Sequence, residues 1–185
     1  MESRKEQLRR RLSSYWKLEI ANVALVPAVM FFLCWRTDQA VGLGLALACV
    51  PMCGLLVIGG LYWRAKLHQL EGRTQTLERV LALARKWRLP LLATTALACV
   101  LAVAVWFTDL AASSGERWAI TTAAILSALE YVNYYHCQLQ HFDHLADWQR
   151  LISGRGFQKS WLARDLERAG RETKDSLSRS KYESF

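Results

Sequence analysis

Apolar residues in this chain gather in four long blocks and do not alternate with polar ones along each helix. The blocks cover residues 18–35, 40–63, 89–108 and 118–137, and the second and third contain no charged residue. A helix of a soluble domain keeps polar residues on its water-facing side. About 20 mostly apolar residues let a helix cross the hydrocarbon core of a bilayer. The pattern therefore predicts an all-α integral membrane protein with four transmembrane helices.

Lysine and arginine lie almost entirely between these blocks, in three segments. Six are in residues 1–17, seven in 64–88 and nine after Cys137, whereas the two remaining connections hold one each, Arg36 and Arg117. Basic residues accumulate on the cytoplasmic side of membrane proteins. We therefore expect a multi-pass protein of the plasma (inner) membrane, with the N-terminus and the C-terminus both cytoplasmic.

The two halves of the chain repeat one another. A Trp, a basic residue and a Leu begin the first and third blocks, a W-x-T-D sequence ends both, and Tyr62 aligns with Tyr134. These features predict two tandem helical hairpins related by an axis along the membrane normal. In each W-x-T-D turn we expect Trp to anchor the outer interface and Thr or Asp to cap the next helix. The turn residues are Trp35 and Asp38 in the first repeat, and Trp106 and Asp109 in the second.

These patterns divide the chain into four parts. A basic cytoplasmic segment, 1–17, precedes the first hairpin repeat with its cytoplasmic helix, 18–88. The second hairpin repeat with its cytoplasmic helical extension covers 89–152. A cytoplasmic C-terminal helix and tail cover 153–185, and we expect the polar tail to be mobile from Gly170 onward when it is not bound to a partner.

Local signals predict the ends of several helices. Pro90 stands at the start of the third span, where a missing N–H costs little. Gly72 interrupts an apolar stripe that continues the second span, and it is expected to break that helix. Apolar residues at three- and four-residue spacing predict that the fourth span continues as helix through 139–152. A further short helix is expected from Trp161, with Ser160 as its N-cap.

Small residues at four-residue spacing mark helix faces that can pack closely. Such stripes let helix backbones approach one another in lipid. They serve either the fold itself or contact with a second subunit, and both uses fit the pattern. The residues are Ala40, Gly44 and Ala48 in the second block, and Ala124 and Ala128 in the fourth.

The fourth block is more polar than its counterpart in the first repeat. Glu130 and Asn133 stand where the first repeat has Ile58 and Leu61. A charged side chain at the centre of a bilayer costs about 2.5 kcal/mol or more, so Glu130 is expected to face protein or water, or to be held protonated. The fold alone does not require these polar groups, because the first hairpin lacks them.

Three interpretations of this polar segment compete. The first is a track for ions or protons along Glu130, Asn133, His136 and Gln140 on the fourth span. The second is an interhelical polar lock, between the hairpins or between subunits. The third is a metal or cofactor site at the cytoplasmic interface, with candidate ligands His136, His141, Asp143, His144 and Asp147. The spacing of His141 and His144 could suit a metal, but paired histidines at helical spacing arise by chance, and we expect no metal and no cofactor.

The charge balance and the missing motifs narrow the function. A net charge of +8 would indicate nucleic acid for a soluble protein, but membrane topology explains it here. We expect no nucleic acid partner and an attraction to anionic lipids at the cytoplasmic face. No catalytic motif of the common enzyme classes is present. The expected function is non-enzymatic: a subunit or scaffold of a membrane complex, or a homo-oligomer. The alternative is an oligomeric ion or proton channel or transporter.

Overall fold

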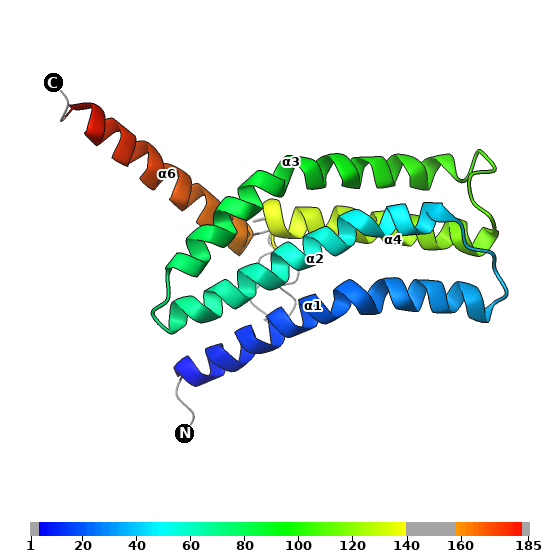
Figure 1. The fold of residues 1–185 in the computed structure, drawn as a ribbon, viewed down its shortest axis with the longest axis horizontal. Helices are drawn as coiled ribbons and strands as arrows, with labels where there is room; N and C mark the ends of the chain where they lie inside the picture. The colour runs from blue at the N-terminus through cyan, green and yellow to red at the C-terminus, as the bar shows by residue number, and fades with distance from the viewer. Residues whose placement is uncertain (1–3, 140–157, 183–185) are drawn as a thin grey trace, which may run out of the picture.

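The computed structural model describes residues 4–139 and 158–182, with side chains as far as Arg171. These residues form five helices, which confirms the all-α class. The single strand-like contact among them is an isolated antiparallel bridge between Cys137 and Lys159. The helices are α1 (Arg4–Arg36), α2 (Leu43–Leu70), α3 (Gln75–Ala104), α4 (Ser114–Tyr135) and α6 (Trp161–Tyr182) (Figure 1).

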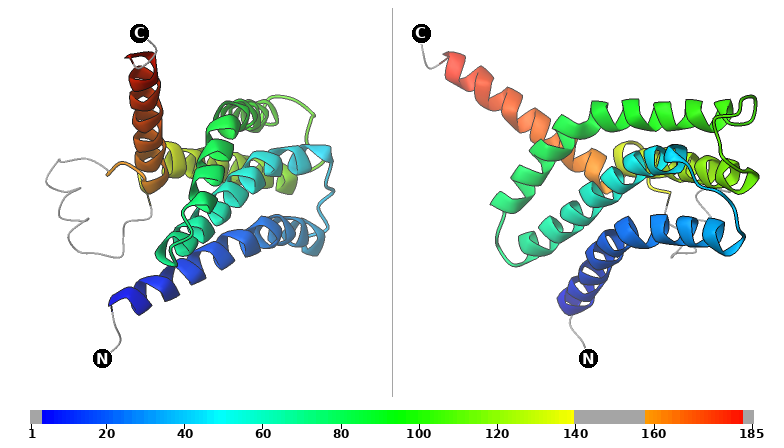
Figure 2. Two further views of the ribbon diagram at one scale, coloured as in Figure 1. Left: turned by 60° about the vertical axis from the view of Figure 1, so that its left-hand side comes forward. Right: turned by 45° about the vertical axis from the view of Figure 1, so that its right-hand side comes forward.

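Helices α1 to α4 run alternately up and down side by side, and α2 contacts each of the other three (Figures 1 and 2). The start of α1, the α2–α3 connection and the start of α6 lie at one end, called the basic end below. The connections 37–42 and 105–113 lie at the other, called the turn end. From the basic end, α6 leads away from the bundle (Figure 2).

Three helices, α1, α2 and α3, are long and apolar enough to cross a membrane. The sequence predicted four spans, but α4 falls short by composition because Glu130, Asn133 and three tyrosines in its last two turns lower its hydropathy. Three candidate spans indicate a multi-pass membrane protein.

The outer surfaces of the candidate spans carry large apolar side chains. Leu33 on α1 is 56% exposed, Leu47 on α2 is 55% exposed, and Leu97 on α3 is 68% exposed. Water-facing surfaces of soluble monomers rarely carry continuous apolar areas of this kind. This surface is suited to contact with lipid chains.

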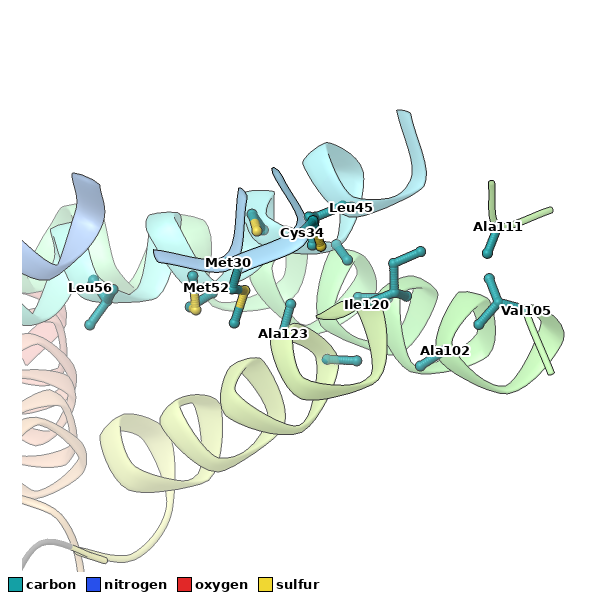
Figure 3. Packing of buried hydrophobic residues seen from close by; sticks show 14 residues of the cluster. Met30, Cys34, Leu45, Met52, Leu56, Ala102, Val105, Ala111, Ile120 and Ala123 are labelled. Carbon is teal, nitrogen blue, oxygen red and sulfur yellow. The ribbon is translucent and has the colours of Figure 1, made fainter. Parts of the chain in front are cut away.

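The core divides into two buried clusters, one toward each end of the bundle. Figure 3 shows the cluster toward the turn end, where Met30 of α1, Leu45 of α2 and Ile120 of α4 meet. The predicted small residues serve this packing. A Cβ at Gly44 would lie 2.9 Å from the Cδ1 atom of Ile120, and Ala48 and Ala124 are buried, whereas Ala128 is half-buried and Ala40 is exposed. The stripe therefore brings α2 and α4 together within one chain.

Several predicted helix ends differ from the observed ones. Gly72, with φ of 84°, lies in the break between α2 and α3, as expected. Pro90 is inside α3 and not at its start, because the helix already begins at Gln75. The fourth span does not continue as helix, since α4 ends at Tyr135 and residues 137–139 are not helical. The rest of the predicted extension, 140–152, lies outside the described residues.

The last helix is longer than predicted. It begins at Trp161, as expected, but it is not short, because it continues to Tyr182 through the polar segment from Gly170. Gly170 costs a helix interior only about 1 kcal/mol, and the helix formers around it keep the helix intact.

Candidate functional site

The polar residues of α4 and the residues that bind them form the candidate site, and they begin with Glu116 at the turn end. The sequence S-x-x-E at 113–116 is typical of a helix N-terminus. The Ser113 hydroxyl accepts a hydrogen bond from the Glu116 N–H at 3.1 Å. The Glu116 carboxylate accepts from the backbone N–H of Ala112 at 2.6 Å and, from the start of α2, those of Gly42 at 2.8 Å and Leu45 at 3.3 Å.

This carboxylate joins the starts of two helices. Glu116 is fully buried, and a negative group is stabilised at helix N-termini, where free N–H groups carry partial positive charge. A Cβ at Gly42 would lie 3.3 Å from each Glu116 oxygen, so glycine leaves room for the carboxylate. The Ser113 hydroxyl also donates to the Ala40 carbonyl at 2.8 Å. We call Ala40, Gly42, Ser113 and Glu116 the turn-end clasp.

The W-x-T-D turns do not cap the next helices, so that prediction is wrong. The N-caps of α2 and α4 are Gly42 and Ser113, several residues farther along the chain. Each of the two threonines instead follows a helix end, and its hydroxyl donates a hydrogen bond to the carbonyl four residues earlier, in the helix that has just ended. Thr37 donates to the Leu33 carbonyl and Thr108 to the Ala104 carbonyl, both at 2.8 Å.

The other residues of these turns face outward. Trp35 is 72% exposed, and Trp106 packs edge-on against Trp118 with ring centroids 5.0 Å apart. Asp38 and Asp109 are both exposed, and Asp38 adopts a φ of 51°. Exposed Trp rings suit the headgroup layer that the sequence predicted for them.

A second buried carboxylate lies toward the basic end. The Tyr134 hydroxyl of α4 donates to the Glu19 carboxylate of α1 at 2.5 Å, and both residues are buried. The bond reaches past α2, and Gly59 makes this possible, since a Cβ there would lie 2.0 Å from the Tyr134 hydroxyl oxygen. The first and last helices of the bundle are thus joined through a glycine of the central helix.

Glu130 and Asn133 complete this group. The Asn133 amide donates to the Glu130 carboxylate at 3.4 Å and accepts from the Leu139 N–H at 2.9 Å. Glu130 is close enough to Glu19 and Tyr134 to act on both electrostatically. We call Glu19, Glu130, Asn133 and Tyr134 the tyrosine cluster; it places two carboxylates and one hydroxyl among apolar helices.

The structure brings together only part of the predicted track. Glu130 and Asn133 are hydrogen-bonded, but His136 is exposed at the C-terminal cap of α4. Gln140 lies outside the described residues, as do the metal candidates His141 and His144. Within residues 4–139 and 158–182, no three His, Cys, Asp or Glu side chains are grouped as metal ligands.

The start of α6 is fixed to the basic end. Ser160 accepts from the Ala163 N–H at 3.1 Å, which confirms the predicted N-cap, and its hydroxyl also donates to the Tyr134 carbonyl. Asp165 accepts from the Tyr62 hydroxyl and pairs with the Lys66 ammonium, each at 2.8 Å. The helix therefore contacts α2 and α4 through buried polar bonds.

Sequence reasoning missed the partners of Glu116, Glu19 and Asp165, although the sequence holds a signal for each of them. The S-x-x-E pattern marked Glu116 as a capping residue. The aligned tyrosines Tyr62 and Tyr134 both donate to a carboxylate, so their equivalence in the repeat extends to their chemistry.

The arrangement can hold helices together through buried hydrogen bonds, and the Glu19 carboxylate that accepts from the Tyr134 hydroxyl has a second acid, Glu130, nearby. Comparisons of the chain with protein-family models, with curated proteins and with solved structures find no match.

Proposed function

We propose that this protein is a non-enzymatic, four-span membrane protein that works through assembly, as a subunit or scaffold of a membrane complex or as a homo-oligomer. In this proposal α4 is the fourth span and α6 meets the partner. The observation that carries it is the placement of α6, fixed to the bundle at its start and leading away from it beyond (Figures 1 and 2).

The attachment of α6 supports α4 as a span. Asp165 contacts Tyr62 and Lys66 of α2, and Arg85 of α3 donates to the Leu166 carbonyl at 3.2 Å. Helix α3 ends at the turn end and α6 starts at the basic end, so the part of the chain that follows α3 and precedes α6 must run from one end of the bundle to the other. Helix α4 makes that return beside α2 and α3, so it passes through the same thickness as the candidate spans. The basic residues gathered at this end support a cytoplasmic location for it in this proposal.

The far half of α6 supports a partner. An isolated helix shorter than about 12–15 residues is marginal in water, and tertiary packing supplies most helix stability. The start of α6 has such packing, because Leu162 is 1% exposed among α2 and α3 residues. A partner surface would supply such tertiary packing for the segment from Gly170 to Tyr182.

Native mass measurement in mild detergent tests this proposal. We expect the wild type to appear in a complex heavier than its own 21.1 kDa, and a chain ending at Ala169 to lose that complex while its bundle stays folded by circular dichroism. A wild type that is monomeric throughout, or a truncated chain that keeps the full complex, would contradict the role of α6.

A second candidate function rests on the tyrosine cluster. Two carboxylates beside one hydroxyl inside the bundle are suited to passing a proton between α1 and α4. Flux in reconstituted vesicles tests it, with Glu130→Gln as the variant and Asp109→Asn, an exposed turn residue, as the control. Loss of flux in Glu130→Gln alone supports proton handling. No flux in the wild type excludes it and leaves assembly.

A further inference from the structure

A basic cavity lies at the basic end, between α3, the end of α4 and the start of α6. Its volume is about 530 Å³, within the range of small-molecule sites. Arg85 and Arg88 line it from α3, Tyr135 from α4, and Lys159 and Ala163 from the start of α6. The tyrosine cluster and the turn-end clasp take no part in it.

The cations of this cavity outnumber its acids. Arg85, Arg88 and Lys159 face a single lining carboxylate, Glu167, which leaves a net charge of two. Lys159 donates a hydrogen bond to Glu167, and this bond holds the pKa of that carboxyl below its usual range. Glu167 is therefore ionised at neutral pH and bound to Lys159, so it does not neutralise the two arginines.

The two arginines keep donors for a ligand. Arg88 forms no hydrogen bond or ion pair with any residue that the structure describes, and its guanidinium lies 6.0 Å from the centroid of the Tyr135 ring. Arg85 uses one nitrogen for the Leu166 carbonyl. A guanidinium has five N–H donors, and residues three apart on a helix share a face, so both can reach one anion.

Two further features favour an anion at the membrane surface. The first turn of α6 borders the cavity through Ala163, and a helix N-terminus carries partial positive charge. Arg88 is also preceded by Trp87 and followed by the apolar segment from Leu89. Trp is enriched where the bilayer meets water, so the cavity lies at headgroup level if α3 spans the membrane.

We propose that this cavity is a binding site for a phosphate group, with Arg85 and Arg88 as its principal ligands. Paired guanidinium groups recognise phosphate through charge-assisted, bidentate hydrogen bonds. At this depth the phosphate is available from the headgroup of an anionic phospholipid, and the same chemistry is available from a soluble phosphate ester.

Lipid titration of the purified full chain in neutral detergent, followed by native mass measurement, tests the site. The wild type is expected to bind phosphatidylglycerol about tenfold more tightly than phosphatidylcholine, and Arg88→Gln to remove most of that preference. Arg85→Gln with Arg88→Gln is expected to abolish it. The matched control is Arg79→Gln with Lys86→Gln, which removes the same charge from exposed positions of α3 outside the cavity.

The control double variant is expected to change the preference less than about twofold. Equal losses in both double variants would show general surface attraction and overturn the site, as would an unchanged Arg88→Gln variant. Arg85→Gln also removes the bond to the Leu166 carbonyl, so the double variant could unfold. In that case the single variant Arg88→Gln, which breaks no hydrogen bond among the described residues, is the deciding test.

A second arm identifies the source of the phosphate. Glycerol 3-phosphate and inorganic phosphate are titrated calorimetrically into the same lipid-free micelles. Binding of these soluble probes that Arg88→Gln abolishes supports a site for phosphate itself. Binding of phosphatidylglycerol alone supports a headgroup site that also needs the acyl chains. Binding of neither the lipid nor the soluble probes overturns the proposal.

Discussion

Two buried carboxylates, Glu116 at the turn end and Glu19 toward the basic end, each join α4 to an earlier helix, but their surroundings differ. Glu116 accepts three backbone N–H groups at the starts of two helices. Glu19 accepts one side-chain hydroxyl and has a second acid, Glu130, nearby. Backbone donors are fixed by the chain around them, and Leu45 is in the first turn of α2, whereas a tyrosine hydroxyl can turn about its C–O bond.

The contrast separates a structural role from a dynamic one. The turn-end clasp is saturated with donors, and its loss leaves backbone groups without partners. The tyrosine cluster has more acceptor oxygens than donors, which leaves hydrogen-bonding capacity for a proton or water. We therefore expect stability to depend mainly on Glu116, and any proton handling to respond to changes around Glu19.

The largest effect is expected from Glu116→Ala. It leaves the N–H groups of Ala112, Gly42 and Leu45 without their acceptor, and a buried donor without a partner costs about 1–3 kcal/mol. We expect a loss of about 3 kcal/mol in unfolding by a denaturing detergent. Asp109→Ala, an exposed acid at the same end, is the control and should change stability little. Equal effects of the two variants would show that the turn-end clasp does not make Glu116 more important for stability than an exposed acid.

Gly59→Ala should have the next largest effect. Its Cβ would occupy the space of the Tyr134 hydroxyl, and overpacking a core typically costs about 1–3 kcal/mol. Combining it with Tyr134→Ala should cost less than the sum of the two single changes, because the clash then disappears. Strict additivity in the same unfolding assay would show that α4 does not pack on Gly59.

A smaller effect is expected from breaking the Glu19–Tyr134 bond. Interhelical hydrogen bonds in membranes contribute about 0.6 kcal/mol on average, so Tyr134→Phe and Glu19→Gln should each cost about 1 kcal/mol or less. A double-mutant cycle measures the coupling between them. A coupling energy larger than the stability loss of Glu116→Ala would reverse the proposed ranking of the two carboxylates.

The smallest effect on stability is expected from Asn133→Leu, because its bond to Glu130 is long at 3.4 Å. Its other bond, from the Leu139 N–H at 2.9 Å, lies beyond the end of α4 at a partly exposed residue, so water can replace the lost acceptor there. A loss of about 0.5 kcal/mol is expected. The same variant removes the donor that orients Glu130, so any proton flux should fall although the free energy of unfolding changes little. A large loss of stability with unchanged flux would assign the tyrosine cluster a purely structural role.

Features that depend on neighbouring residues were predictable from the sequence. The apolar blocks marked α1 to α3, and Ser160 marked the start of α6, because each signal lies within a few residues of the structure it produces. The partners of Glu116 and Asp165 were not predictable, since Gly42 lies 74 residues before one and Tyr62 lies 103 residues before the other. The end of α4 at Tyr135 also escaped prediction, because Ser160 binds the freed Tyr134 carbonyl from a distant part of the chain.

The antiparallel contact before α6 has a consequence for dividing the chain into two fragments. The Gln138 N–H donates to the Gln158 carbonyl at 2.8 Å, and the Ser160 N–H donates to the His136 carbonyl at 3.1 Å. These bonds and the Asp165 contacts with Tyr62 and Lys66 join α6 to the bundle directly, apart from the peptide that connects α4 to α6. Two separately expressed fragments, divided between residues 140 and 157, should accordingly find each other and rebuild the same junction.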